Sequence, residues 1–358
     1  MSAILNLSNV TKSYGALKAL DGLDLAVPSD AYVSLLGPSG SGKTTLLRVI
    51  AGYEAPEQGT VQFRGNAIEA LPPYERDIGF VFQNFALFPH LSVAKNIAFG
   101  LENRAVNPIR DPNVVQAKVR DIVSLVGLGG LEERGVTQIS GGQRQRVALA
   151  RTLVTEPALV LLDEPLGALD ANLRARMRSE LRQIRKRCGV TFLHVTGSET
   201  EALAMGDTVL VLDRGRVIQA DTADDLYGRP NSMAVARFLN SYNLFDGQPD
   251  DNMFTGPQGR FPLDGSVVQP SGSPGYAIRY DRIDIRPRNV GPADGEVAIE
   301  ATFVADEYSG AAIVSLFAMD GGGVFEVETH LSQSEPPLLT PNDRYALVWK
   351  RRDALVYA

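Results

Sequence analysis

A short glycine-rich segment holds the residues best suited to chemistry. Residues 37–45 read GPSGSGKTT, and Gly37, Gly42, Lys43 and Thr44 satisfy the pattern G-x-x-x-x-G-K-[ST]. Glycines let backbone N–H groups curve around a phosphate, and a helix that begins near Lys43 adds its positive end. Lys43 supplies a charge for the β- and γ-phosphates, and the Thr44 hydroxyl can ligate Mg²⁺. The segment predicts a nucleotide phosphate site with contacts at Gly37, Ser39, Gly40, Ser41, Gly42, Lys43, Thr44 and Thr45.

An apolar run that ends in two acidic residues adds the second half of this chemistry. Residues 158–165 read ALVLLDEP, as in a central parallel strand that is buried on both faces. Asp163 ends that strand, where it is suited to holding Mg²⁺ through water. Glu164 is expected to project toward the γ-phosphate, where a carboxylate orients or deprotonates the attacking water. Together with the phosphate loop, the two carboxylates predict nucleotide hydrolysis.

The surrounding sequence predicts the elements that position these residues. The segment YVSLLG at 32–37 is an apolar strand that leads into the loop, and TTLLRVIAG at 44–52 has helical spacing and a terminal glycine. Residues 91–135 read as mostly helical, while AILNLSNV, LDGLDLAV, TFLHV and TVLVLD read as strands. We therefore expect an α/β domain over residues 1–240, with a helical subdomain at about 88–150.

The character of the sequence changes near residue 240. Residues 246–275 are rich in Gly, Pro, Asp and Ser, and short alternating apolar segments follow them. DGGG between two apolar runs is a hairpin signal. Residues 241–358 therefore predict a small all-β domain, an OB-like barrel, after the α/β domain.

Length and composition exclude several classes. A chain of 358 residues suits two domains, and 44% hydrophobic residues suffice for packed cores. Lys and Arg number 35 against 42 Asp and Glu, and the net charge of −7 argues against broad nucleic-acid binding. Cys188 is the single cysteine, so an intramolecular disulfide is excluded. The N-terminal residues do not read as a secretory signal, and no run reaches the roughly 18 apolar residues that span a bilayer. A role at a membrane therefore needs another chain.

The segment between the two motifs carries a family resemblance. Residues 139–143 read ISGGQ and are similar to the LSGGQ signature of ATP-binding cassette ATPases, with Ile139 in place of leucine. These residues would open a helix whose N-terminus can face a phosphate. The resemblance implies ATP and Mg²⁺ as cofactors. It also implies a homodimer in which one chain caps the ATP bound by its partner through Ser140, Gly141, Gly142 and Gln143.

Other positions match the family one by one. Tyr14 resembles the aromatic residue that stacks on adenine, with an ordinary strand aromatic as the alternative. Gln83 resembles the glutamine that contacts Mg²⁺ and relays to the membrane partner, and Asp170 belongs to a segment like the loop that crosses the dimer interface. The resemblance thus assigns catalysis to Glu164, Gln83 and Lys43, and the metal to Thr44, Gln83 and Asp163. A permease contact is implied, with core packing as the alternative, for Phe85, Phe88, Pro89 and His90.

Residues 238–247 and the tail resemble, more loosely, those of importer ATPases for polyamines, ferric ion and phosphonates. This resemblance implies an importer subunit that is peripheral at the cytoplasmic face of the inner membrane. Its implied partners are a second copy of itself, two permease subunits and, indirectly, an extracytoplasmic solute-binding protein, without nucleic acid. The solute stays open among a polyamine, an aminophosphonate and ferric ion.

One family residue is replaced. The family pattern VTHDQTEAL places a histidine against the γ-phosphate, and the same frame here reads VTGSETEAL, so Gly197 stands at that position. His194 lies three residues earlier, about 10 Å away on the opposite face of an extended strand, and a packed histidine is its simpler interpretation. Ser198 is adjacent and can donate, but its S-x-x-E spacing to Glu201 also fits a helix N-cap.

Three alternatives stay open at this level. Gly197 favours a weakly hydrolysing, ATP-gated clamp or regulatory cassette, whereas Glu164 favours a motor. A soluble cassette ATPase of DNA repair or translation would usually carry a long coiled coil or two cassettes, and the sequence predicts neither. Residues 171–188 are rich in arginine, for which a solvated helix face with some dimer contacts is preferred to a nucleic-acid or lipid patch.

Overall fold

The chain divides into two compact units. A computed structural model describes residues 3–104, 107–167, 169–250, 252–264, 268–269, 273–332 and 335–358. The first unit is Met1–Leu226 and the second is Tyr227–Ala358. The division lies before the predicted boundary at residues 240 and 241, because helix α8 (Met233–Leu239) packs on two strands of the second unit, β11 (Tyr242–Asp246) and β16 (Gly275–Arg279).

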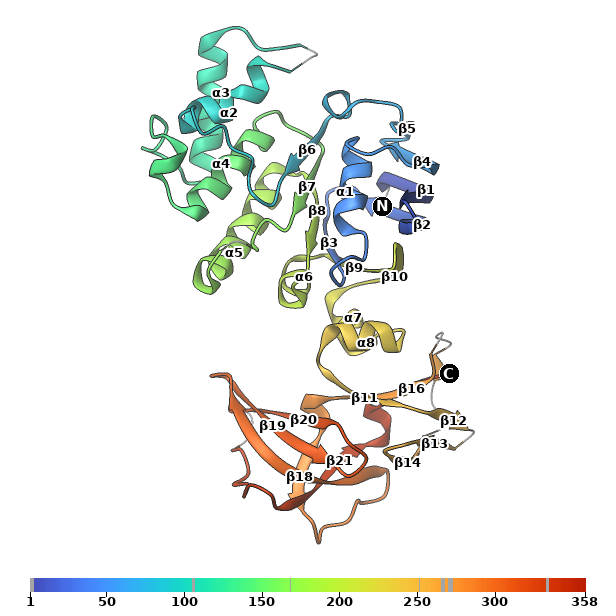
Figure 1. Cartoon of the computed structure of the whole chain (residues 1–358). Helices are drawn as coiled ribbons and strands as arrows, with labels where there is room; N and C mark the ends of the chain where they lie inside the picture. The colour runs from blue at the N-terminus through green and yellow to red at the C-terminus, as the bar shows by residue number, and fades with distance from the viewer. Residues whose placement is uncertain are drawn as a thin grey trace. The chain divides into compact units, whose positions relative to one another are not determined.

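A six-stranded sheet forms the centre of the first unit (Figure 1). Its strands, in sheet order, are β10 (Arg216–Asp221), β9 (Thr208–Asp213), β3 (Tyr32–Leu36), β8 (Thr191–Thr196), β7 (Leu159–Asp163) and β6 (Ile78–Val81). Neighbouring strands are parallel, except that β10 is antiparallel to β9. Every residue of β3, β7 and β8 is buried, as their continuous apolar runs predict.

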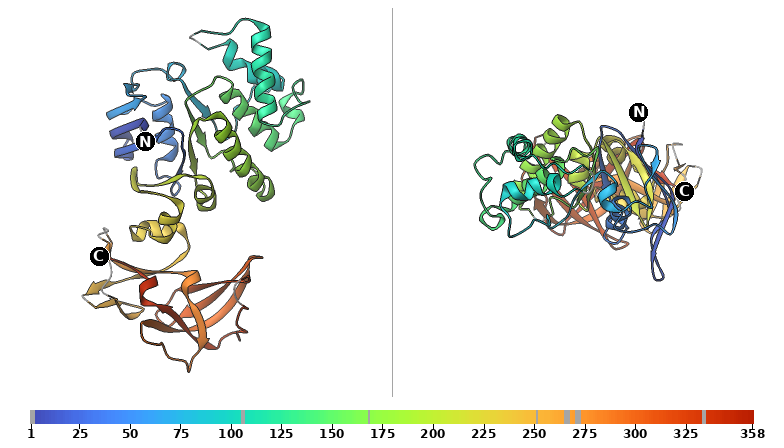
Figure 2. Two further views of the ribbon diagram at one scale, coloured as in Figure 1. Left: turned by 180° about the vertical axis from the view of Figure 1, so that it is seen from behind. Right: turned by 90° about the horizontal axis from the view of Figure 1, so that it is seen from above.

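A second sheet and one helix cover one face of this sheet. The antiparallel strands are β2 (Leu17–Pro28), β1 (Ala3–Tyr14), β4 (Gln58–Phe63) and β5 (Asn66–Ala67). Helix α1 (Lys43–Ala51) lies between the two sheets, as both views of the ribbon show (Figures 1 and 2). Its buried leucines pack with Leu159 and Leu161 of β7 in one apolar core. This layer fixes the loop that precedes α1.

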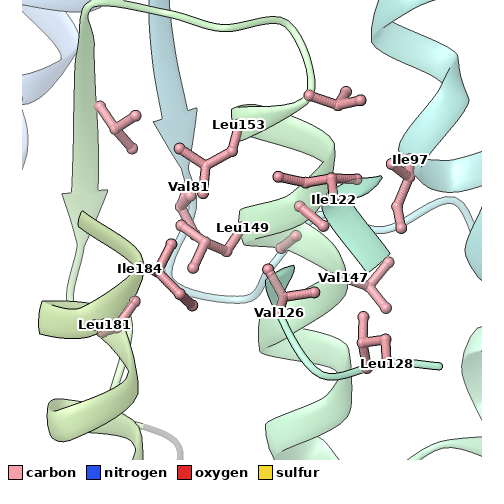
Figure 3. Packing of buried hydrophobic residues seen from close by; sticks show 14 of the residues in the cluster. Val81, Ile97, Ile122, Val126, Leu128, Val147, Leu149, Leu153, Leu181 and Ile184 are labelled. Carbon is pink, nitrogen blue, oxygen red and sulfur yellow. The ribbon is translucent and has the colours of Figure 1, made fainter. Parts of the chain in front are cut away.

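The opposite face of the six-stranded sheet is covered by helices. They are α2 (Val93–Glu102), α3 (Pro112–Leu125), α4 (Gly141–Leu153), α5 (Ala171–Cys188) and α6 (Glu199–Met205). Of the short 3-10 turns, η1 (Pro73–Glu75) precedes β6, and η2 (Val136–Gln138) precedes α4. Val160 and Leu162, which alternate with Leu159 and Leu161 along β7, join the core formed with these helices, part of which is drawn in Figure 3. The expectation that residues 91–135 are mostly helical is met by α2 and α3. Within the described residues, no helix has the length and apolar character needed to cross a membrane.

The second unit is built of short strands around an aromatic core. After α7 (Ala223–Gly228) and α8, its strands form sheets of order β11-β16-β22-β15, β12-β13-β14 and β17-β21-β18-β19-β20. Their further bounds are β12 (Gln248–Asp250), β13 (Met253–Gly256), β14 (Gly259–Pro262), β15 (Val268–Gln269), β17 (Asp284–Pro287), β18 (Glu296–Tyr308), β19 (Ala312–Met319), β20 (Val324–His330), β21 (Arg344–Lys350) and β22 (Leu355–Tyr357), with 3-10 turns η3 (Tyr280–Arg282) and η4 (Arg351–Asp353).

Buried aromatic side chains hold this unit together. Phe245, Phe261, Tyr276, Phe325 and Trp349 contact one another in its core. The DGGG segment joins β19 to β20 as a hairpin, as the sequence predicts. The expected small all-β domain is therefore confirmed.

Candidate functional site

The glycine-rich loop lies between β3 and α1, where close packing excludes larger residues. A Cβ on Gly37 would lie 2.3 Å from the carbonyl oxygen of Leu212, and a Cβ on Gly42 would lie 2.2 Å from that of Ala19. Gly42 also has φ of 106°, a left-handed conformation that favours glycine. Because both glycines face backbone rather than movable side chains, the pattern of glycines in the sequence has a direct steric cause.

Lys43 points into its own loop. Its Nζ donates to the carbonyl oxygens of Gly37 at 2.8 Å and Pro38 at 2.9 Å. Burial lowers the pKa of Lys43, while the nearby carboxylates of Glu164 and Asp163 oppose that shift. The ammonium therefore lies inside the loop, where a phosphate bound by the loop's N–H groups would meet it.

Asp163 and Thr44 form the oxygen pair that could hold a metal. Asp163 ends β7 and is 8% exposed, and the Thr44 hydroxyl donates to its Oδ1 at 3.4 Å. Burial raises the pKa of Asp163, with the negative charge of Glu164 as a further cause. Hydroxyl and carboxylate oxygens are ligands that Mg²⁺ accepts, and this ion commonly completes its shell with water and nucleotide phosphates. The pair therefore fits a magnesium ion that is bound together with a nucleotide.

Gln83 and Glu164 are in direct contact. The Gln83 amide Nε2 donates to Glu164 Oε2 at 2.8 Å. Glu164 follows β7 with φ of 44°, and its backbone N–H donates to the Val195 carbonyl oxygen at 3.0 Å. This turned backbone and the amide of Gln83 together fix the direction of the carboxylate. Two residues placed 81 positions apart in the chain thus form one unit of the site.

Tyr14 lies at the end of β1, in the hairpin whose second strand contacts the phosphate loop through Ala19. Its side chain is 44% exposed, and the Lys12 ammonium lies 5.5 Å from the centre of its ring. An exposed ring in this hairpin is accessible for stacking, and the adenine-stacking role stays a prediction. The alternative of an ordinary strand aromatic stays open as well.

The signature residues form the N-terminus of α4, on the other face of the sheet from α1. Ser140 is the N-cap: its Oγ accepts from Gln143 N at 3.3 Å, and Gln143 Oε1 accepts from Ser140 N at 2.8 Å. A Cβ on Gly142 would lie 3.0 Å from the Leu173 side chain of α5. One chain therefore brings together Lys43, Thr44, Gln83, Asp163 and Glu164, but it leaves Ser140, Gly141, Gly142 and Gln143 in a separate layer.

Asp170 begins α5. Its Oδ1 accepts from Leu173 N at 2.9 Å and caps the helix. The preceding Ala168, which is part of the predicted interface loop, lies outside the described residues. The carboxylate thus has a structural role within the chain, and its role at a dimer interface stays a prediction.

There is free space at Gly197, the position at which the family pattern has a histidine. A Cβ on Gly197 would have no atom within 4 Å. His194 is fully buried, and its Nδ1 lies 3.0 Å from the Tyr32 hydroxyl, so the interpretation as a packed strand histidine is confirmed. Burial lowers the pKa of His194 to about 3. Its ring is therefore neutral near neutral pH and faces away from the phosphate loop's side of the site.

Ser198 caps α6, but the predicted capping box forms only in part. Ser198 Oγ accepts from Glu201 N at 3.3 Å. The Glu201 carboxylate does not return to Ser198; it accepts from the Thr196 hydroxyl at 2.8 Å, and Ser198 N donates to Thr196 Oγ1 at 3.0 Å. Sequence reasoning missed this inward turn of Glu201, because an S-x-x-E pattern predicts the cap without predicting which way the glutamate side chain turns.

Arg174, near the start of α5, also contacts Glu201. Its Nε lies 3.5 Å from Glu201 Oε1, and its Nη2 donates to the Leu169 carbonyl oxygen at 3.0 Å. The basic composition of residues 171–188 gave no signal for this contact. The end of β8 and the start of α5 are therefore joined through one buried carboxylate.

Comparison with known proteins defines the class. Residues 20–167 match the family model described as ABC transporter. The spermidine/putrescine import ATP-binding protein PotA of Clostridioides difficile is 47% identical over 68% of this chain and 69% of its own length. The Fe(3+) ions import ATP-binding protein FbpC 1 of Haemophilus influenzae is 44% identical over 70% of this chain and 75% of its own. The site is that of an ATP-binding cassette ATPase, with ATP and Mg²⁺ as cofactors. The chain belongs to the ABC transporter family.

Two further comparisons address the whole chain and the fold. The uncharacterized ABC transporter ATP-binding protein YdcT of Escherichia coli is 39% identical over 98% of this chain and 97% of its own, so that match includes the second unit. An ATP-binding cassette solved as a dimer after hydrolysis, with ADP and phosphate, has a TM-score of 0.55 at 30% identity, over 61% of this chain and 98% of its own. The predicted cassette fold is therefore confirmed.

Proposed function

We propose that this chain hydrolyses ATP to drive import of a small solute, of the polyamine, aminophosphonate or ferric-ion type. The observation that carries the proposal is the convergence of Lys43, Thr44, Asp163, Glu164 and Gln83 in one site. The names of relatives at 44–47% identity, which act on spermidine, putrescine and Fe(3+) ions, support import and the class of solute.

Each residue of this site has a distinct task. The loop N–H groups and Lys43 bind the phosphates, and Thr44, Asp163 and the amide oxygen of Gln83 would hold a Mg²⁺ ion. Such an ion would supply positive charge beside the phosphate oxygens. Glu164 orients the attacking water and accepts its proton. Gln83 serves both groups, because its Nε2 holds Glu164 at 2.8 Å while its amide oxygen is left for the metal.

The active form is a homodimer. The signature residues lie across the sheet from α1, so they do not reach a nucleotide held by their own phosphate loop. The well-formed N-terminus of α4 suits a phosphate that a second copy of the chain presents. The dimeric cassette with ADP and phosphate supports this arrangement by its similarity.

Permease subunits dock on the helical layer. A groove of about 640 Å³ runs between α2 and α3, and its lining includes His90, Leu91, Ala94, Phe99, Pro112 and Val119. Phe99 is 38% exposed, and its ring lies 4.4 Å from that of Phe88. An apolar groove of this kind accepts a short helix of a partner. Two permease subunits would hold the dimer at the cytoplasmic face of the inner membrane, and an extracytoplasmic solute-binding protein would deliver the solute.

Gly197 supports a second candidate, an ATP-gated clamp that hydrolyses slowly. Removal of one donor to a developing oxyanion costs about 10²–10³ in rate. In a homodimer both sites would lack the histidine. The contact between Gln83 and Glu164 favours the motor, since the carboxylate that acts on water is present and oriented.

ATP turnover by the chain reconstituted with its permease in proteoliposomes tests the proposal. Glu164→Gln should abolish turnover and uptake, while ATP binding is kept. Spermidine, Fe³⁺ and 2-aminoethylphosphonate offered separately identify the solute. Rapid ATP turnover without uptake of any of them would contradict the importer, and turnover that survives Glu164→Gln would contradict the role of Glu164.

A further inference from the structure

The signature helix carries a second group at its other end. Arg151 lies in the last turn of α4. Its Nη1 donates to the Ala86 carbonyl oxygen at 2.7 Å, and its Nη2 donates to that of Phe85 at 2.8 Å. The guanidinium carbon lies 5.6 Å from the centre of the Phe88 ring. A planar fork that bonds two successive carbonyls fixes their relative orientation, which a single ammonium does not.

The turn that Arg151 holds is conformationally unusual. Phe85 has φ of 64° and Ala86 has φ of 45°, so two successive residues with side chains are left-handed. Such residues disfavour this region and keep it only where their surroundings fix it. Just before it, Phe85 N donates to the Phe82 carbonyl oxygen at 2.9 Å, which closes a tight turn over Gln83 and Asn84, and Ala86 N donates to the Asn84 carbonyl oxygen at 2.8 Å. From outside, Arg151 supplies two hydrogen bonds to the turn, and the buried Phe85 side chain packs in the core beside the helices.

Gln83 lies between this turn and the end of a fixed strand. Upstream, Val81 ends β6 and pairs with Leu162 of β7. Downstream, the turn begins two residues later, at Phe85. The position of the Gln83 amide, 2.8 Å from Glu164, therefore depends on both anchors. One of them is the sheet, and the other is the turn, which Arg151 and the burial of the Phe85 side chain hold.

We propose that Arg151 is a positioning residue for hydrolysis, which holds the Phe85–Ala86 turn and thereby keeps Gln83 against Glu164. The inference depends on the role proposed above for Glu164. Ser140 and Arg151 are joined by a continuous helix of roughly 16 Å at 1.5 Å per residue. Movement of the signature end of α4 is thus transmitted to the turn, and the placement of Gln83 follows the placement of α4.

Steady-state ATP turnover by the purified full-length chain tests the proposal. Arg151→Met keeps an unbranched side chain at this position and removes both hydrogen bonds. We expect kcat to fall about 10- to 100-fold, as for a displaced catalytic group, with KM for ATP within about twofold of wild type. Arg151→Lys should recover part of the rate. The matched control is Arg146→Met on the same helix, whose side chain is 17% exposed and pairs with Glu180 rather than with the turn; its kcat should change by less than about twofold.

A double variant separates positioning from general stability. If Arg151 acts through Gln83, Arg151→Met should slow Gln83→Ala no further, because the two changes remove one interaction. If the kcat losses of Arg151→Met and Gln83→Ala instead multiply in the double variant, the inference is overturned. A raised KM for ATP at unchanged kcat in Arg151→Met would also overturn it. Turnover that survives Glu164→Gln would instead refute the proposed role of Glu164, whatever Arg151 does.

Amide hydrogen exchange gives a readout that does not need turnover. In Arg151→Met, the N–H groups of Phe85 and Ala86 should exchange at least about tenfold faster than in wild type, while the N–H groups of the phosphate loop keep their protection. In the control Arg146→Met, the N–H groups of Phe85 and Ala86 should also keep their protection. Unchanged exchange at the turn would show that Arg151 does not hold it, and the inference would fail.

Discussion

At the scale of single residues, Gly197 leaves an open space rather than a filled one. A Cβ at this position would meet no atom within 4 Å, and the backbone is not in the left-handed region that favours glycine. His194 does not replace the missing imidazole, because it is buried against Tyr32, and the Ser198 hydroxyl accepts a hydrogen bond as a helix cap. The chain has therefore lost a donor while keeping the geometry that could accept it.

Gly197→His should consequently fold normally and hydrolyse ATP faster. One oriented donor to the γ-phosphate is worth about 10²–10³ in rate, so an increase of at least tenfold in kcat is expected. The measurement is steady-state turnover of the full chain with saturating ATP and Mg²⁺. Gly197→Phe is the matched control, since it fills the same space without a donor and should give no increase. Equal rates for wild type and Gly197→His would show that another group already supplies the contact.

His194 makes stability depend on pH. Burial lowers its pKa from 6.5 to about 3, so the folded state excludes a proton that the unfolded state binds below pH 6.5. The stability is complete above that pH and is lost progressively as the pH falls toward 3. Through His194 alone, the free energy of unfolding should be about 1.4 kcal/mol lower at pH 5.5 than at pH 7.5. The groups that face the His194 ring are the Tyr32 hydroxyl and the Glu201 carboxylate, whose Oε2 lies 4.0 Å from His194 Nε2.

Urea unfolding of the full chain at pH 7.5 and pH 5.5, followed by circular dichroism, tests this dependence. In His194→Leu the loss of free energy of unfolding between the two pH values should be smaller than in wild type by about 1.4 kcal/mol. The control is His330→Leu, because the His330 side chain is 42% exposed. An identical pH dependence in wild type and His194→Leu would contradict the burial argument.

At the scale of elements, α6 tests what Ser198 does. Its Oγ accepts from Glu201 N, which is the geometry of an N-cap. Ser198→Ala should destabilise the first unit by about 1 kcal/mol, while Ser198→Asp should retain the cap. If capping is its only role, kcat per folded molecule should be unchanged in Ser198→Ala. A large fall in kcat without loss of stability would show that the hydroxyl acts on the phosphate instead.

Local patterns predicted the elements and the residues at their ends. The loop from Gly37 to Thr44, the strand that ends at Asp163 and the cap at Ser140 are each set by a few neighbouring residues, so their spacing in the sequence suffices. The family resemblance added Gln83, which no local pattern distinguishes.

Contacts between distant segments were not predictable in the same way. Gln83 meets Glu164 across 81 residues, and Arg151 meets Phe85 across 66. Periodicity gives the face on which a side chain lies, but not the partner or the rotamer that completes the contact. Glu201 illustrates the limit: its spacing predicts a cap, and its side chain turns to Thr196 instead.

At the scale of the whole molecule, the two units have separate cores. The described core residues of the first unit lie in two clusters, and those of the second lie in one aromatic cluster. The single tryptophan, Trp349, belongs to the second unit, is 2% exposed and donates from Nε1 to the Tyr276 hydroxyl at 2.6 Å. Its fluorescence therefore reports unfolding of the second unit alone, while circular dichroism reports both units.

Nucleotide should stabilise one unit without the other. With Glu164→Gln to prevent turnover, ATP and Mg²⁺ at 100 times the dissociation constant should add about 2.7 kcal/mol to the free energy of unfolding of the first unit. The urea transition seen by circular dichroism at helix wavelengths should move to higher urea, because α1 to α5 all belong to this unit. The Trp349 transition should stay where it is without nucleotide. If it moves by the same amount, the second unit is energetically coupled to the nucleotide site, and a ligand of the second unit would by linkage change ATP affinity by an equal factor.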